Sequence, residues 1–158
     1  MSKKVVPWLL VIAWLGVIFL LSHQPATASN QLSKKVTAAI AGIIRLAAPG
    51  FDADSLAVHR AVREWAHFFA FFVLGLMSAV ATGKIGLRGL RGIGVAFGFC
   101  VLCAVLDEWH QRYVPGRGAE LSDVLADAGG AAAALALFGI GAFIRRRFRH
   151  GSIRGKRK

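Results

Sequence analysis

Four long apolar stretches constrain the fold of this chain more than any other feature of its sequence. They occupy residues 5–21, 65–82, 92–106 and 124–144, and charged or polar links separate them. A helix needs about 20 residues to cross the hydrocarbon core of a bilayer, where every backbone polar group must be satisfied within the protein. The sequence therefore predicts an all-α integral membrane bundle of four transmembrane helices.

The composition agrees with a membrane protein of one domain. Hydrophobic residues make up 56% of the 158 positions, well above what an ordinary soluble domain contains. The third apolar stretch is short for a span, so we expect its helix to continue through Gln111. That extension places Asp107 and Glu108 at the membrane surface or slightly below it.

The first apolar stretch has an alternative interpretation as a secretory signal. Lys3 and Lys4 precede it, and Ala26-Thr27-Ala28 follows it like a cleavage site. We favour a retained helix because the apolar run is longer than a usual signal core and contains Trp8 and Trp14. Either interpretation leaves the other three helices unchanged.

The link after the first stretch contains an amphipathic pattern. Apolar residues recur there at helical spacing, while lysines and an arginine lie elsewhere around the turn. This pattern predicts a short interfacial amphipathic helix that ends near Pro49-Gly50, followed by a helix that starts near Asp54 or Ser55 and leads into the second span. The apolar positions are Leu32, Val36, Ile40, Ile43 and Ala47, and the cations are Lys34, Lys35 and Arg45.

The net charge of +12 is concentrated at the C-terminal end of the chain. The sequence predicts a transmembrane domain over residues 1–144 and a basic cytoplasmic tail over residues 145–158. A cationic segment directly behind an apolar span is typical of an anchor that contacts anionic lipids of the inner leaflet. Nucleic acid is not the expected partner.

The distribution of the other cations predicts that both termini are cytoplasmic. Lys3 and Lys4 precede the first span, and the short second link is also basic. The first link opposes this orientation, since its cations are only partly offset by Asp52, Asp54 and Glu64. The cations of the first link are Lys34, Lys35, Arg45, Arg60 and Arg63, and those of the second link are Lys84, Arg88 and Arg91.

Alternation of the four helices brings the unusual polar residues to one membrane face. Ionised side chains near the bilayer centre cost about 2.5 to 3.5 kcal/mol each, so a cluster of them indicates either a function or mutual pairing. Asp107 shares a helix face with Gln111, and Asp123 shares one with Asp127, which should lie deeper. The candidate binding residues are His67, Asp107, Glu108, Gln111, Arg117, Asp123 and Asp127; Ser22, His23 and Gln24 reach the same face.

These residue types are compatible with several kinds of site. Asp107 or Glu108 could act as a general acid or base, whereas Arg117, Arg112 and the backbone amides at the start of the fourth helix could hold a phosphate or carboxylate without chemistry. A network of the same groups could also serve folding alone. A metal site would draw its ligands from His67, Glu108, Asp123 and Asp127, although their spacing is not diagnostic. The sequence specifies no cofactor and no oligomeric state.

Three segments of the chain resemble one known family. Ser22-His23-Gln24-Pro25, His67-Phe68 and the run from Asp107 to Ala131 are similar to the VanZ-like family of small bacterial membrane proteins, named for a teicoplanin-resistance factor. Asp127 stands where many members have Asn. The resemblance implies a multi-pass protein of the bacterial inner membrane with a role in the cell envelope or in glycopeptide resistance. The matching positions are Asp107, Glu108, Gln111, Pro115, Arg117, Asp123 and Gly130.

Together these observations favour an outward polar vestibule that recognises an anionic envelope component, either a lipid phosphate or a cell-wall precursor. Arg117 is expected to contact the anion, with Asp107, Glu108 and Asp123 holding Arg117 and His67 in place and Gln111 donating neutral hydrogen bonds. The first alternative is a membrane-embedded enzyme that acts on a lipid-linked phosphate. The second is a structural partner of another envelope protein, suggested by the small residues of the last two spans.

Overall fold

The computed structural model describes residues 4–47 and 56–155, and this part of the chain is built from helices. Four of these helices, α1, α3, α4 and α5, are long and apolar enough to cross a membrane. The predicted four-helix membrane bundle with an additional helix in the first link is confirmed. The helices are α1 (Val5–Ser22), α2 (Ala26–Ala47), α3 (Leu56–Lys84), α4 (Gly89–Gln111) and α5 (Leu121–Gly155).

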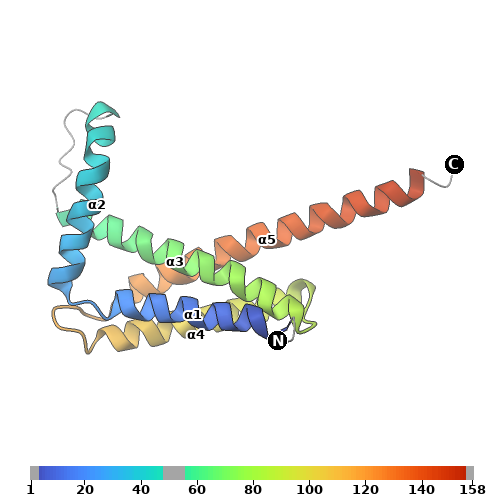
Figure 1. Ribbon diagram of the computed structural model, residues 1–158, viewed down its shortest axis with the longest axis horizontal. Coiled ribbons are helices and arrows are strands. Elements are labelled where there is room, and N and C mark those ends of the chain that lie inside the picture. Colours follow the sequence, from blue (N-terminus) through green and yellow to red (C-terminus); the bar gives the residue numbers. More distant parts are fainter. Residues whose placement is uncertain (1–3, 48–55, 156–158) are drawn as a thin grey trace.

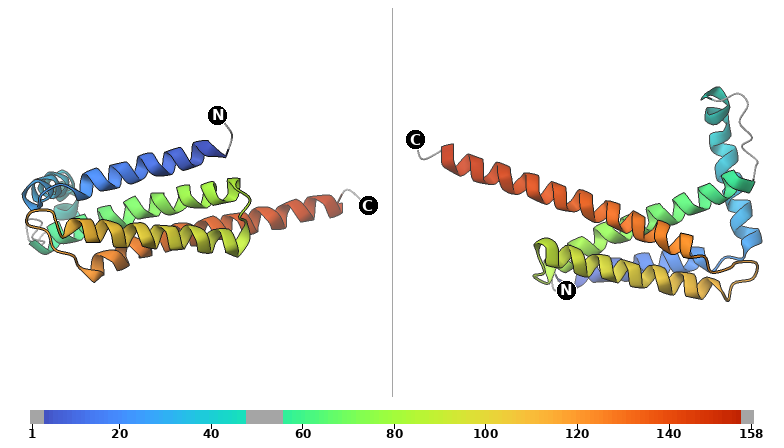
Figure 2. Two further views of the ribbon diagram at one scale, coloured as in Figure 1. Left: turned by 90° about the horizontal axis from the view of Figure 1, so that it is seen from below. Right: turned by 180° about the vertical axis from the view of Figure 1, so that it is seen from behind.

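The four long helices run alternately up and down the bundle (Figures 1 and 2). The N-terminus of α1, the α3–α4 turn and the C-terminal half of α5 lie toward one end. The α1–α2 turn, the start of α3 and the α4–α5 loop lie at the other end. Helix α3 is central because it packs against each of the other four helices. As predicted, α4 continues through Gln111.

Small residues allow α3 and α5 to approach closely. A Cβ atom on Gly130 would overlap the backbone carbonyl oxygen of Phe68, and one on Gly75 would lie 3.0 Å from the backbone oxygen of Ala131. Contacts of this kind are typical of helices packed within a membrane. Phe71 and Leu74 of α3 are fully buried beside this contact. The two helices therefore approach closely at Gly130.

Helix α2 differs in direction from the bundle and stands across its end (Figure 1). It begins earlier than the apolar pattern predicted, because Pro25 accepts the first helical hydrogen bond, from Ser29 at 3.0 Å, and proline is compatible with a first helical turn. Ser33 and Thr37 are buried, whereas Lys34 and Lys35 are exposed. The predicted helix end at Pro49-Gly50 and the predicted caps Asp54 and Ser55 lie outside the described residues.

Helix α5 continues beyond the membrane span. The apolar segment ends at Arg145, but the helix extends to Gly155 and projects past the other helices (Figures 1 and 2). Arg145 and Arg147 are exposed on this extension. The interaction of the basic tail with anionic lipids stays a prediction.

Candidate functional site

The predicted polar residues meet at the α2 end of the bundle. His67 lies in the N-terminal half of α3, Asp107 and Gln111 lie at the end of α4, and Asp127 lies near the start of α5. Ser22, the last residue of α1, completes the group. Each of the four spans therefore contributes at least one side chain, as the alternating topology requires.

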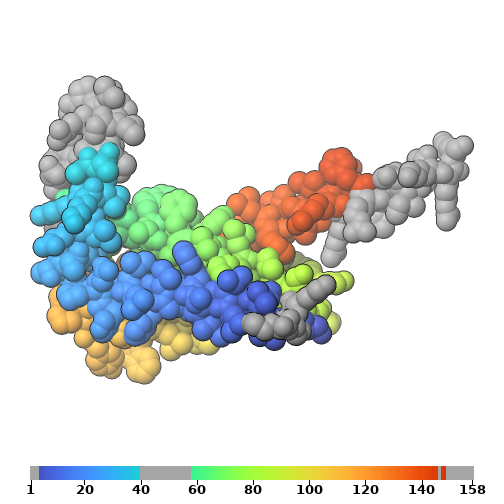
Figure 3. All heavy atoms as spheres, viewed as in Figure 1, coloured from blue at the N-terminus to red at the C-terminus, as the bar shows by residue number. Residues whose placement is uncertain are grey.

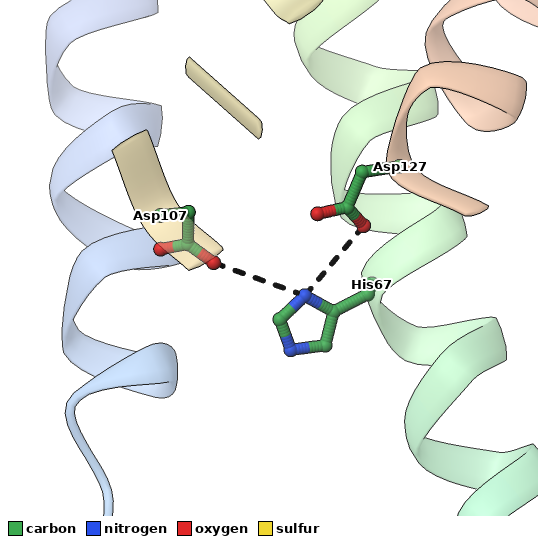
Figure 4. Close-up of side chains that lie close together, drawn as sticks. All are labelled: His67, Asp107 and Asp127. Atoms are coloured by element: carbon green, nitrogen blue, oxygen red, sulfur yellow. Dashed lines mark ion pairs between the residues drawn. The ribbon is translucent and has the colours of Figure 1, made fainter. Parts of the chain in front are cut away.

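His67 lies between two buried carboxylates (Figure 4). Its Nδ1 atom is 3.6 Å from Oδ1 of Asp127 and 4.0 Å from Oδ2 of Asp107. The two acidic side chains are only 3% and 7% exposed, respectively. One ligand atom from each of the three residues lies within 4.8 Å of the others. Such a group can share a proton or hold a cation.

Asp107 is fixed by two hydrogen bonds to the same oxygen. The hydroxyl of Ser22 donates to Oδ2 of Asp107 at 2.8 Å, and the amide nitrogen of Gln111 donates to the same atom at 3.2 Å. Ser22 is fully buried and Gln111 is 3% exposed. The carboxylate thus joins α1 to α4 as well as facing His67.

Asp127 is less well satisfied than Asp107. Its Oδ1 atom is buried and accepts no hydrogen bond from the part of the chain that the structure describes. A buried acceptor without a donor is costly, and most buried polar atoms in proteins have a partner. This oxygen is therefore the atom of the cluster most in need of a proton, a cation or a ligand donor. Asp127 is more buried within the protein than Asp123, which is only partly buried.

The loop between α4 and α5 positions Arg117. Val114-Pro115-Gly116-Arg117 has the residues of a type II turn, with Pro second and a glycine of φ 74° third, and the Arg117 N–H donates to the Val114 carbonyl oxygen at 3.1 Å. The carbonyl oxygen of Pro115 also accepts a hydrogen bond from Ala26, the first residue of α2, at 3.2 Å. The turn therefore fixes the arginine against the rest of the site.

The guanidinium of Arg117 does not form an ion pair with any carboxylate of the described residues. It donates to the side-chain oxygen of Gln111 at 3.2 Å, and its Nε atom is buried without a partner among the described residues. Partial burial, together with the nearby Arg63 guanidinium, lowers the pKa of Arg117 from its ordinary value. The expected pairing of Arg117 with Asp107, Glu108 or Asp123 is thus replaced by a bond to Gln111, whose amide lies between the arginine and Asp107.

Glu108 and Asp123 lie outside the histidine cluster. Glu108 accepts a hydrogen bond from the backbone N–H of Glu120 at 2.6 Å, so it ties the end of α4 to the residue that precedes α5. A carboxylate at a helix N-terminus is favourable in itself. Among the described residues, the group with metal-ligand geometry contains Asp107 together with His67 and Asp127, rather than Glu108 and Asp123.

A polar cavity of about 210 Å³ adjoins the cluster. Its lining combines His67 and Gln111 with cations and acids from α3, the α4–α5 loop and α5. Arg60 and Arg63 also line the cavity, although neither is among the candidate binding residues predicted from the sequence. The available signal was spacing, since Arg63 lies four residues before His67 on the same helix face. The charged lining residues are Arg60, Arg63, Glu64, Arg117, Glu120 and Asp123.

Comparison with known proteins identifies the family. A family model described as VanZ/LLP1 matches residues 7–143. The chain belongs to the VanZ/LLP1 family. The match covers nearly all of the four spans of this VanZ/LLP1 protein and every residue of the polar cluster, which confirms the resemblance inferred from the sequence. Neither the curated proteins nor the solved structures include a match.

Two further histidines of this VanZ/LLP1 protein form a separate pair. His23 Nδ1 lies 3.1 Å from His110 Nε2, and the ring of Phe19 stacks on the His23 imidazole and lies tilted against that of His110. His23 is exposed and His110 is partly exposed. The pair therefore lies at the surface of this end of the bundle, away from the buried His67 cluster.

Proposed function

We propose that this protein recognises an anionic cell-envelope component, a lipid phosphate or a lipid-linked cell-wall precursor, in the polar cavity at the α2 end of the bundle. The observation that carries the proposal is the set of arginines in that cavity. Arg60, Arg63 and Arg117 line one volume of about 210 Å³, and none of them forms an ion pair within 4.0 Å with a described carboxylate.

Electrostatics supports an anionic ligand. Arg63 repels the Arg117 guanidinium while Asp107, Glu108 and Asp123 attract it, and the Nε donor of Arg117 is left without a partner among the described residues. An oxyanion between these groups would relieve the repulsion and accept the free donor. Arginine is suited to this because its guanidinium presents several donors in a plane that matches phosphate and carboxylate oxygens.

The position of the cavity supports a ligand taken from the outer side of the membrane. The cavity is lined by the start of α3, the α4–α5 loop and the start of α5. These elements lie at the end of the bundle away from the N-terminus of α1 and the end of α5 (Figure 1). Because the terminal segments and the second link are basic, we infer that both termini are cytoplasmic and that the cavity faces outward across a bacterial inner membrane. A link to glycopeptide resistance would follow if the ligand is a cell-wall precursor.

Substitution of Arg117 tests the proposal. Arg117→Ala should abolish association of the detergent-solubilised protein with a long-chain polyprenyl monophosphate. The substitution removes both a positive charge and the hydrogen-bond donors of a guanidinium that the turn holds in place. Asp127→Asn should have a mild effect, since Asp127 does not line the cavity. Arg112→Ala is the matched control, because Arg112 is an exposed arginine close in sequence that also does not line it. Equal affinities of the Arg117 and Arg112 variants would refute the assignment.

A second candidate function, hydrolysis of a lipid-linked phosphate, is favoured by the geometry around His67. Both Asp107 and Asp127 approach the Nδ1 atom of His67, an arrangement compatible with acid–base or metal-assisted chemistry. The Oδ1 atom of Asp127, which lacks a hydrogen-bond partner among the described residues, would suit a cation. The three residues could hold a divalent cation, which would supply Lewis-acid activation of a water molecule or a phosphoryl oxygen.

The enzymatic alternative predicts a different set of sensitive residues. If it holds, His67→Ala and Asp107→Asn should abolish phosphate release from polyprenyl-phosphate substrates, and a chelator should do the same if a metal takes part. Glu108→Gln should act mainly through the α4–α5 loop, because Glu108 accepts its bond from Glu120. Binding that persists without phosphate release in the unmodified protein would favour recognition alone.

A further inference from the structure

An apolar groove adjoins the polar cavity. It has a volume of about 510 Å³ and lies where α1, α2 and the first turns of the α3 span meet. Figure 3 shows α1 and α2 adjoining at this end of the molecule. The lining is dominated by aliphatic and aromatic side chains, among them Ile18 and Leu21 of α1, Leu32 and Val36 of α2, and Ala66 and Phe69 of α3.

The groove and the polar cavity share part of their lining. Arg63, His67 and Arg117 border both volumes. The apolar space therefore begins beside the arginines of the polar cavity. A molecule with an anionic group at one end and a hydrocarbon chain at the other would match this succession of surfaces.

The groove is also accessible from the side of the bundle. Leu21, Leu32 and Phe69, which line it, are 45%, 47% and 57% exposed. In a bilayer these side chains face lipid, so a hydrocarbon chain could enter laterally without first passing into water.

We propose that the groove holds the hydrocarbon chain of a lipid phosphate whose headgroup binds at Arg63 and Arg117. This inference rests on the proposed function and specifies its ligand class, since it requires the phosphate and the chain to belong to one molecule. A soluble sugar phosphate or a peptide would leave the groove unused. A tail of a neighbouring bulk lipid, or a second copy of this chain, would fill the groove without depending on the arginines.

The test compares two probes with the same headgroup. One is a long-chain polyprenyl monophosphate, and the other is a short, water-soluble alkyl monophosphate. Binding of each to the full-length protein is measured at equilibrium in mild detergent. If the chain occupies the groove, the unmodified protein should bind the long probe at least about tenfold more tightly, because the chain packs against the groove and adds contacts that the short probe lacks.

Filling the groove should remove the advantage of the long probe. Ala66→Trp places a large ring in the groove from α3, and we expect it to weaken binding of the long probe about tenfold or more while leaving the short probe unchanged. Ala61→Trp is the matched control on the same helix, because Ala61 is exposed and lines neither volume.

A second pair of variants tests the groove from α2 in case Ala66→Trp does not fold. Val36→Trp should repeat the selective loss, whereas Ala38→Trp, at an exposed position outside the groove, should not. Tryptophan is well tolerated at a membrane interface, which makes both substitutions acceptable for folding. Circular dichroism and size-exclusion chromatography would establish that the compared variants are folded.

The outcomes separate the two proposals. Equal affinity for the long probe in the groove variants and their controls would overturn the groove inference, and so would equal loss of both probes. Binding of the corresponding long-chain alcohol as tightly as the phosphate would also overturn it, because the groove would then take any hydrocarbon. If Arg117→Ala binds both phosphate probes as well as the unmodified protein does, the proposed anion site itself fails.

Discussion

Gln111 connects the two functional parts of the site. Its amide nitrogen donates to Asp107, and its amide oxygen accepts a hydrogen bond from Arg117. Asp107 in turn accepts a bond from Ser22 and faces His67. A ligand that moves the Arg117 guanidinium would therefore act through Gln111 on the hydrogen bonds of Asp107, which faces His67. The sequence suggested a neutral donor at this position, but it did not indicate the bond with the arginine.

The Ser22→Ala variant should destabilise the protein through Asp107. It removes a buried donor from a carboxylate, and we expect a loss of about 1 to 2 kcal/mol in the free energy of unfolding. Denaturation of the detergent-solubilised protein would measure this loss. Ser122→Ala is the control, because Ser122 is exposed and its side-chain contacts are long, at 3.4 and 3.5 Å. Equal stability of the two variants would show that the bond contributes nothing.

At the scale of helices, the contact between α3 and α5 determines the depth of the cluster. Gly130 lies against the backbone of Phe68. Phe68 is the residue after His67, and Gly130 is three residues after Asp127. The closest approach of the two helices therefore occurs beside the histidine and the aspartate that face each other. The run of small residues in α5 predicted a close neighbour, although the identity of that neighbour came only from the assembled bundle.

Two adjacent glycines provide a matched test of this contact. Gly130→Ala should lower the free energy of unfolding by roughly 1 to 3 kcal/mol, because the added Cβ atom meets rigid backbone and the helices must separate. Gly129→Ala should be nearly neutral, since its Cβ atom would lie 3.8 Å from the ring of Phe68. Thermal unfolding in detergent would compare them. A neutral Gly130→Ala variant would mean that the close approach is not needed.

For the molecule as a whole, the charge pattern has two origins. The basic second link and the C-terminal segment fit a cytoplasmic side, but the first link is basic as well. In the structure, Arg60 and Arg63 of that link line the polar cavity together with Arg117. In the proposed orientation, their place in the cavity accounts for cations on the outward side of the membrane.

Cysteine labelling would test the orientation. In a background with Cys100→Ala and Cys103→Ala, we expect Ala119→Cys in the α4–α5 loop to react with a membrane-impermeant maleimide in intact cells. Ile85→Cys in the α3–α4 turn is the control and should react only after permeabilisation, because this turn lies at the opposite end of the bundle (Figure 2). Both positions are exposed, so accessibility within the protein does not limit the reaction. The reverse pattern would contradict cytoplasmic termini.

The sequence by itself determined the number of spans and the end of the bundle at which the polar residues meet. Both follow from local properties, since the length of an apolar run sets whether a helix crosses the bilayer and strict alternation sets the side of each link. It also predicted the α2 helix. The apolar pattern placed the start of this helix too late, because its first turns consist mainly of small and polar residues. Spacing along one helix correctly paired Asp107 with Gln111.

Only the tertiary structure decided which acids face His67. Asp107 and Glu108 are adjacent on α4 and point in different directions, so the packing of that helix selects Asp107 for the cluster and turns Glu108 toward the α5 N-terminus. The rotation and depth of each helix depend on contacts such as that of Gly130 with Phe68, which join residues distant in the chain. Periodicity gives the face of a helix but not the partner that the face meets.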